Sequence, residues 1–276
     1  MKNVPGRKTD LAEAQWLADV AAHGMVRPSF VPPPPIRALR ELTRYRKTQI
    51  DARARALQRL EKVLQDAGIK LTSVASTVWS KSSRDMIEAM ISGERDPVIL
   101  AGMARQRLRT KIGGLEEALN GHFDAHHGNV CRAIIAHIDF LDRAIAELNA
   151  GIDAWMADYE SAIALLTSIP GVQRLTARVM VAEMGMDMSI FPTLGHLCAW
   201  EGVAPASYES AGRRRPAGSR RGDPWLKQAL VEAAKAAART RGTYLGAHYR
   251  RISRSRRPSI ATLRQRTPSL GSRGTS

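Results

Sequence analysis

The chain contains only two cysteines, Cys131 and Cys198, among its 276 residues. Two thiols cannot make a disulfide framework or a four-cysteine zinc site, so a cytosolic protein with reduced thiols is expected. The sequence also lacks any run of about 18 apolar residues, which excludes a membrane-spanning helix. The first ten residues are polar and basic with no apolar run behind them, so we expect no secretory signal.

Acidic residues are scarce in the C-terminal part of the chain. The formal charge is +16, from 42 Lys+Arg and 26 Asp+Glu, and no acid follows Glu232. Between Arg213 and Arg257 the sequence holds 14 basic residues but only two acids, Asp223 and Glu232. Nucleic acid is the commonest polyanion that such a charge meets in a cell. The clustering favours a phosphate-binding surface over the alternative, a solvated basic tail.

Hydrophobic residues make up 44% of the chain, which is enough for real cores. Their spacing predicts a mostly α protein with almost no strand signal. We expect residues 1–35 to form a helix at Asp10–Val20 followed by a proline-rich linker. Residues 36–165 are expected to form a coiled-coil module. Residues 166–251 should form a compact helical domain, and residues 252–276 a basic, disordered tail. The helices expected around the compact domain are 161–168, 174–184, 194–201 and 224–240.

Two long helices make up most of the expected coiled-coil module. One covers Ile36–Ala67, and the other covers Val130–Leu166, where apolar residues alternate steps of four and three. This 3.5-residue period is typical of a coiled coil. Its seam must pack against the first helix, folding back antiparallel, or against a second copy of the chain. The segment between them predicts shorter helices, broken at Gly93, Pro97, Gly113-Gly114 and Gly121.

The sequence Ile169-Pro170-Gly171-Val172 predicts a tight turn between two helices. Pro170 stops the first helix, and Gly171 permits a positive φ. The second helix then begins with free N–H groups that can hold a phosphate, and Arg174 and Arg178 add positive charge. This pattern resembles a helix-hairpin-helix, although Gln173 stands where such hairpins usually carry a second glycine. An ordinary helix–helix corner is the alternative.

A loop rich in proline and glycine, Trp200–Gly212, carries Ser207 and Ser210 beside Arg213-Arg214-Arg215. Serine becomes a useful nucleophile when positive groups stabilise its alkoxide and the charge of a phosphorane. Arginines can supply that stabilisation in phosphoryl transfer. The pattern alone leaves open a solvated basic loop, and it does not choose between the two serines.

Several single residues carry two interpretations. His122, His126 and His127 suggest zinc, but no completing ligand spacing is present, which favours a polar helix junction. Trp225 could stack on a nucleotide, although burial against the helix that follows it is favoured. Cys198 is expected to be buried and inert.

Eight segments together resemble one known family. They are Asn3–Asp10, Arg27–Pro32, Ile36–Arg46, Ile169–Val172, Phe191-Pro192, Trp200–Pro205, Glu209–Gly212 and Gly222–Leu226. In order, over about residues 2–251, they closely resemble the insertion-sequence-110 transposases (insertion sequences 110, 116 and 902). The resemblance implies a RuvC-like α/β nuclease domain with four acidic residues for Mg²⁺, then a coiled coil, then a helical transposase domain with a nucleophilic serine. It also implies DNA ends and target DNA as partners, a structured bridge RNA as guide, and a homo-oligomer (dimer or tetramer) joined through the coiled coil.

The resemblance also implies roles for individual residues. The nucleophile falls on Ser210, with Ser207 as competitor, and two of the four magnesium-binding acids fall on Asp10 and Glu13. Attraction of acids to a helix N-terminus is the alternative for those two. The expected nucleic-acid contacts are Gly171, Arg174, Arg178, Arg213, Arg214, Arg215, Arg220, Arg221 and Lys227.

The chain departs from the family pattern at both ends. The other two acids would precede Met1, and Glu13 stands where the family usually has aspartate. After Arg251 the family continues with an apolar helix, whereas this chain turns to Ser, Arg, Gly and Thr. We therefore expect a truncated remnant of the RuvC-like domain and an out-of-frame tail, in a bacterial, cytoplasmic, nucleoid-associated protein. The alternative to an active transposase is a binding-only remnant or a pseudogene product.

Overall fold

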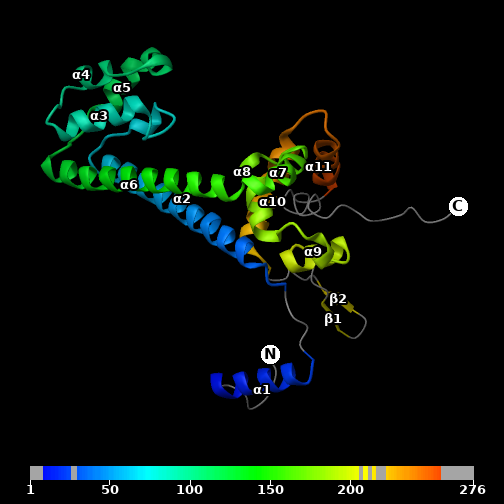
Figure 1. The fold of residues 1–276 in the computed structure, drawn as a ribbon. Coiled ribbons are helices and arrows are strands. Elements are labelled where there is room, and N and C mark those ends of the chain that lie inside the picture. Colours follow the sequence, from blue (N-terminus) through cyan, green and yellow to red (C-terminus); the bar gives the residue numbers. More distant parts are fainter. Residues whose placement is uncertain (1–8, 26–29, 205–207, 211–212, 216–221, 256–276) are drawn as a thin grey trace.

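The computed structural model describes residues 9–25, 30–204, 208–210, 213–215 and 222–255, and most of them are helical (Figure 1). The helices are α1 (Asp10–Ala22), α2 (Pro34–Asp66), α3 (Lys81–Ile91), α4 (Pro97–Gly102), α5 (Ile112–Leu119), α6 (Ala125–Trp155), α7 (Glu160–Thr167), α8 (Arg174–Met184), α9 (Leu194–Glu201), α10 (Pro224–Arg239) and α11 (Tyr244–Ser255). Short 3-10 turns lie at Leu71–Ser73, Gln106–Lys111, Ala157–Tyr159 and Met188–Ile190. The prediction of a mostly α protein is confirmed, and within these ranges no helix has the length and apolar character to cross a bilayer.

Helices α2 and α6 lie side by side and form a long two-helix arm (Figure 1). They run antiparallel, because Arg46 bonds to Asn149 while Arg53 bonds to Asp142. The two partners on each helix are seven residues apart, so the register advances by one heptad between the two contacts. At 1.5 Å per residue, the 33 residues of α2 make the arm about 50 Å long. Two partners were expected for the seam of the second long helix, and the one present in this chain is α2, packed antiparallel.

The prediction of one continuous helix over Val130–Leu166 is wrong at the C-terminal end of that range. Helix α6 ends at Trp155, a 3-10 turn follows, and α7 begins at Glu160. The change of direction buries Met156 and Ile163 in the core at the base of the arm. Trp155, the last residue of α6, remains 49% exposed.

A small helical cap, α3–α5, sits at the tip of the arm (Figure 1). It packs on the C-terminal half of α2 and the N-terminal half of α6, in a core that includes Leu60, Met86 and Ile138. Gly93 and Pro97 break the helices as expected, but Gly113-Gly114 lies inside α5. His127 and Asp124 form a capping box at the start of α6, which supports the polar-junction interpretation of the histidines.

Arg84 joins the cap to the arm, because its two terminal nitrogens bond to the Asp139 carboxylate at 2.5 and 2.7 Å. These hydrogen bonds hold the pKa of Asp139 below its ordinary value. A carboxyl group whose pKa is lower in the folded than in the unfolded protein stabilises the folded state at pH values above its unfolded-state pKa. This stabilisation is lost as the pH falls through its folded-state pKa.

We therefore expect Asp139→Asn to lower the free energy of unfolding at pH 7 by well under about 1 kcal/mol, because solvent screens this half-exposed pair. The difference from wild type should shrink as the pH falls below the ordinary Asp range. Urea unfolding at pH 7 and at pH 3 measures both quantities. A difference that is equal at the two pH values would contradict the assignment.

The base of the arm forms a second core. Leu39 of α2, Val181 of α8 and Leu226 of α10 are all buried there, and α8 contacts α2, α7 and α10. Helix α11, which packs against α10, extends the ordered C-terminal part beyond the boundary expected at residue 251. Ile252 is buried and continues the apolar face of α11, so residues 252–255 do not belong to a disordered tail. Residues 256–276 lie outside the described part.

Candidate nucleic-acid interface

Helices α7 and α8 meet at the turn predicted from Pro170 and Gly171. The Ile169 N–H donates to Leu166 at 3.1 Å and the Val172 N–H donates to Ile169 at 3.0 Å. Gly171 has φ +91°, and a Cβ there would lie 2.4 Å from the Ala233 carbonyl oxygen of α10. The glycine is therefore required both for its backbone angle and for contact with α10. Its close approach is to a helix, which differs from the phosphate contact that we expected of it.

Arg174 and Arg178 begin the second helix of this hairpin, and both are ion-paired. Arg174 binds both oxygens of Glu160, at 2.5 and 2.6 Å, and Arg178 pairs with Asp153. The hydrogen bonds from Arg174 hold the pKa of Glu160 below its ordinary value. The Gln173 side chain does not cap α8, so the first N–H groups of α8 have no side-chain acceptor from that position.

Ser210 lies on a short β-hairpin where a loop was expected. Strand β1 (Tyr208–Ser210) pairs antiparallel with β2 (Arg213–Arg215). In this register Ser210 is opposite Arg213, and Glu209 is opposite Arg214. No strand was predicted here because each strand has only three residues, too few for an alternating pattern. Ser207, Arg220 and Arg221 lie outside the described residues.

The segment after this hairpin is fixed by Gly222 and Asp223. A Cβ on Gly222 would lie 2.2 Å from the Glu201 carbonyl, so the chain passes directly against the end of α9. Asp223 caps α10 by accepting from the Trp225 and Leu226 N–H groups at 2.8 and 3.0 Å. Lys227, one turn further on, reaches toward the Gly202 carbonyl at 3.5 Å.

A buried ion network ties the arm to this segment. The Glu183 side chain is fully buried, accepts hydrogen bonds from Arg44 at 2.9 and 2.7 Å, and forms an ion pair with Arg40 at 2.9 Å. Arg44 also donates to Asp223 at 2.6 Å. Burial raises the pKa of the Glu183 carboxyl, and the hydrogen bonds from Arg44 oppose that rise. Arg44 of α2 therefore links the buried carboxylate of α8 to the N-cap residue of α10.

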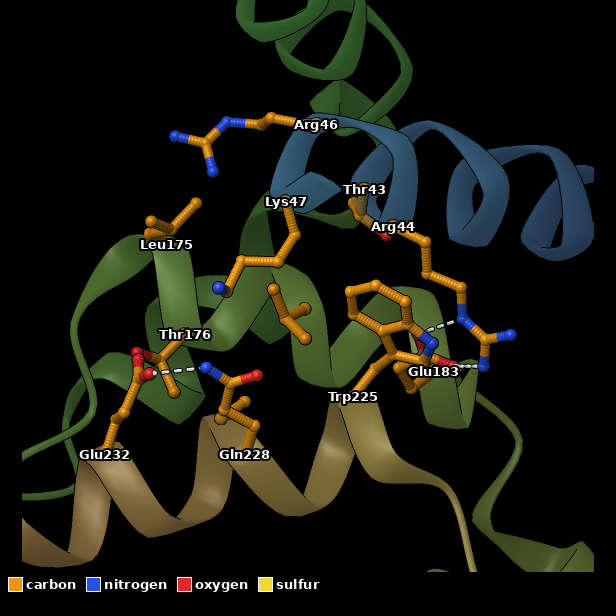
Figure 2. A pocket seen from close by; sticks show the side chains of 12 residues that line it. Thr43, Arg44, Arg46, Lys47, Leu175, Thr176, Glu183, Trp225, Gln228 and Glu232 are labelled. Atoms are coloured by element: carbon orange, nitrogen blue, oxygen red, sulfur yellow. Dashed lines mark hydrogen bonds and ion pairs between the residues drawn. The ribbon is translucent and has the colours of Figure 1, made fainter. Parts of the chain in front are cut away.

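Figure 2 shows the small cavity beside this network, about 90 Å³ in volume, between α2, α8 and α10. Trp225 rises into it from α10, and the Arg44 guanidinium lies over the indole ring, 5.8 Å from its centre. Lys47 pairs with Asp51 at 2.5 Å, and Gln228 donates to Glu232 at 3.1 Å. The half-buried Trp225 thus packs under an arginine of the arm, which favours the structural interpretation over nucleotide stacking.

Sequence reasoning missed Arg40, Arg44 and Glu183. One signal was available: Glu183 is a lone acid that follows the apolar run Val179–Ala182, and a buried carboxylate requires a cationic partner. Cys198 is buried as expected, and burial raises the pKa of its thiol. Burial also raises the pKa of Cys131 to about 11, so both thiols are poor nucleophiles.

Two family models match this chain. The model described as Transposase IS116/IS110/IS902 family matches residues 163–250, and a transposase model of the DEDD type from insertion sequence 110 matches residues 1–69. Together the two matches cover more than half of the sequence. The chain belongs to the IS110/IS116/IS902 family of transposases. No curated protein matches it significantly.

Membership of this family implies that DNA is a partner. Transposases of the DEDD type typically depend on a metal, and the residues expected to bind it in this chain are Asp10 and Glu13. Both are exposed and lie in the first turn of α1, which Thr9 caps, and α1 has no buried residue and stands clear of the other helices (Figure 1). In the described ranges, no group of three or more His, Cys, Asp or Glu residues could hold a metal ion. Two exposed carboxylates do not fit a two-metal site.

Proposed function

We propose that this IS110-family chain binds the DNA of an insertion sequence through residues 166–251 and transfers DNA strands by nucleophilic attack of Ser210. The observation that carries the proposal is the register of the β-hairpin, in which Ser210 is opposite Arg213. The hairpin brings the nucleophile next to the basic run Arg213–Arg215 along the backbone, and α10 and the arm hold the end of this segment through Asp223.

The proposed step exchanges one phosphodiester for another. The Ser210 Oγ forms a bond to a DNA phosphorus, and one ester oxygen of the strand leaves and takes up a proton as a free hydroxyl. Positive charge beside the phosphorus stabilises the additional negative charge of the transition state, and this is the role proposed for Arg213–Arg215. Attack by the hydroxyl end of a second strand on the phosphoserine releases Ser210 and completes the transfer.

Further parts of the proposal rest on the family resemblance. A structured bridge RNA guides the choice of DNA, and a dimer or tetramer forms through the arm. Asp10 and Glu13 are proposed as two carboxylates of the family's acidic cluster. Because they do not fit a complete magnesium site, no step above passes through the metal. The proposed location is the bacterial cytoplasm, at the nucleoid.

The proposal is tested by trapping the covalent intermediate. Purified protein is mixed with labelled element-end DNA, guide RNA and Mg²⁺, then denatured and separated by size. We expect a protein–DNA adduct that is absent in Ser210→Ala, because no other atom would carry the phosphate. Ser207→Ala is the matched control and should retain the adduct. An adduct that survives in Ser210→Ala and disappears in Ser207→Ala would move the nucleophile to Ser207.

A binding-only protein is the second candidate function, favoured by the lack of a metal-binding group in the described ranges. Under this alternative, no variant forms an adduct, but wild type still binds the DNA with an affinity that falls steeply with salt, since phosphate contacts release counterions.

A further inference from the structure

We propose that the cap at the tip of the arm carries a second nucleic-acid site, which holds the phosphate backbone of a strand in a basic cavity. The cavity has a volume of about 670 Å³ and lies between the start of α3 and the 3-10 turn Gln106–Lys111. All its lining residues fall within 74–111, outside the segments matched by the two family models. The inference therefore extends the proposed function to a part of the chain that neither match covers.

The charge of this cavity is of one sign. Its lining includes four cations, Lys81, Arg105, Arg107 and Lys111, and no carboxylate. Asp85 is the nearby acid that bonds to one of them, Arg105, at 2.5 Å. The side chains of Lys81 and Arg107 make no hydrogen bond or ion pair with any residue that the structure describes. Cations left without partners around a cavity attract an anion.

The walls of the cavity are fixed before any ligand arrives. The Arg105 N–H donates to the buried Ser82 hydroxyl at 3.0 Å, which ties the turn to the start of α3. Lys111 donates to the Val74 carbonyl at 3.1 Å, and both residues line the cavity. Gln106 has φ +51°, and no other non-glycine residue in the described ranges has a positive φ. This strained backbone conformation lies between Arg105 and Arg107, which both line the cavity.

The lining selects the backbone of a nucleic acid and not its bases. Cations and hydroxyl groups are the usual contacts to phosphate oxygens, and three serines, Ser76, Ser80 and Ser82, accompany the four cations here. No aromatic side chain lines the cavity, so a stacking platform for bases is not provided. The lining therefore predicts binding that is independent of sequence and sensitive to salt.

The arm sets the distance between this site and the C-terminal domain. An arm about 50 Å long corresponds to about 15 base pairs of a straight duplex at 3.4 Å per step. A nucleic acid that contacts both ends must therefore be longer than this. Probes of about 30 base pairs satisfy the condition.

The test compares two double variants with equal loss of charge. Lys81→Gln with Arg107→Gln removes the two unpaired cations of the cavity. Arg55→Gln with Lys62→Gln removes two exposed cations of α2 outside it. Binding of 30-base-pair DNA and RNA duplexes is measured by fluorescence anisotropy over a range of salt concentrations, and circular dichroism confirms folding.

We expect the cavity variant to bind at least about tenfold more weakly at 0.1 M salt on one or both probes. On DNA, its negative slope of log affinity against log salt concentration should become shallower by about 1.8. The α2 variant should stay close to wild type in both quantities. A loss on RNA alone assigns the site to RNA, and a loss on DNA alone assigns it to DNA. Equal binding by the two variants overturns the tip site and leaves the proposed function intact. A flat salt response of wild type on both probes overturns both.

Discussion

Glu183→Ala is expected to lower the free energy of unfolding by about 3–5 kcal/mol, because it removes one partner of a buried ion network. The Glu183 side chain is fully buried, and the side chains of Arg40 and Arg44 are only 16% and 32% exposed. Without the carboxylate, two guanidinium groups remain in the interface between α2 and α8 with less compensation. Urea unfolding followed by circular dichroism measures the loss.

The same loss should separate the arm from the C-terminal helices. Glu183 binds both arginines of α2, and Arg44 also reaches Asp223, the cap of α10. Glu160→Ala is the matched control, because Glu160 also accepts two hydrogen bonds from one arginine but is half exposed. Solvent screens the exposed pair, so its removal should have a far smaller effect. Equal losses in the two variants would show that burial does not set the strength of the Glu183 network.

Gly171→Ala is expected to destabilise the chain by about 2–5 kcal/mol. A positive φ costs about 1–2 kcal/mol for a residue with a Cβ, and overpacking adds about 1–3 kcal/mol. The new Cβ would meet backbone atoms of α10, 2.4 Å from the Ala233 oxygen and 2.5 Å from the Ala237 nitrogen. Backbone cannot move aside as a flexible side chain could. Thermal unfolding, together with DNA binding, measures the effect on fold and interface.

Gly151→Ala provides a control with the opposite expected sign. Gly151 lies within α6, and nothing lies within 4 Å of a Cβ built there. Alanine is favoured over glycine inside a helix by about 0.5–1 kcal/mol, so this variant should be slightly more stable than wild type. If Gly171→Ala were as stable as Gly151→Ala, the close packing of the turn on α10 would be refuted.

Local sequence signals were sufficient for several helix starts in the C-terminal part of the chain. Asp223-Pro224 marks the start of α10 and Thr193 that of α9, because an N-cap side chain and a proline at the first position favour helix initiation. The expected bounds 174–184 and 194–201 agree with α8 and α9. Pro170 and Gly171 identified the turn correctly, because a helix stop and a positive φ are properties of single residues.

Features that depend on tertiary contacts could not be predicted in the same way. The heptad pattern continues to Leu166, yet the chain turns after Trp155, since burial of Met156 and Ile163 at the base outweighs continuation of the helix. Arg44 and Glu183 are 139 positions apart, and no local pattern connects them. The acidic cluster and the nucleophile remain predictions from the family, because no described contact joins α1 to the β-hairpin.

The paired register of α2 and α6 restricts how this protein can change in length. Seven residues inserted into one helix alone would either bulge out as a loop or shift every contact beyond the insertion. Matched insertions in both helices would preserve the pairing of Arg46 with Asn149. Each matched heptad would lengthen the arm by about 10 Å. That is about three base pairs, or close to a third of a helical turn of B-form DNA. Variation among relatives should therefore occur in coupled heptads, and each step would turn the tip toward a different side of a bound duplex.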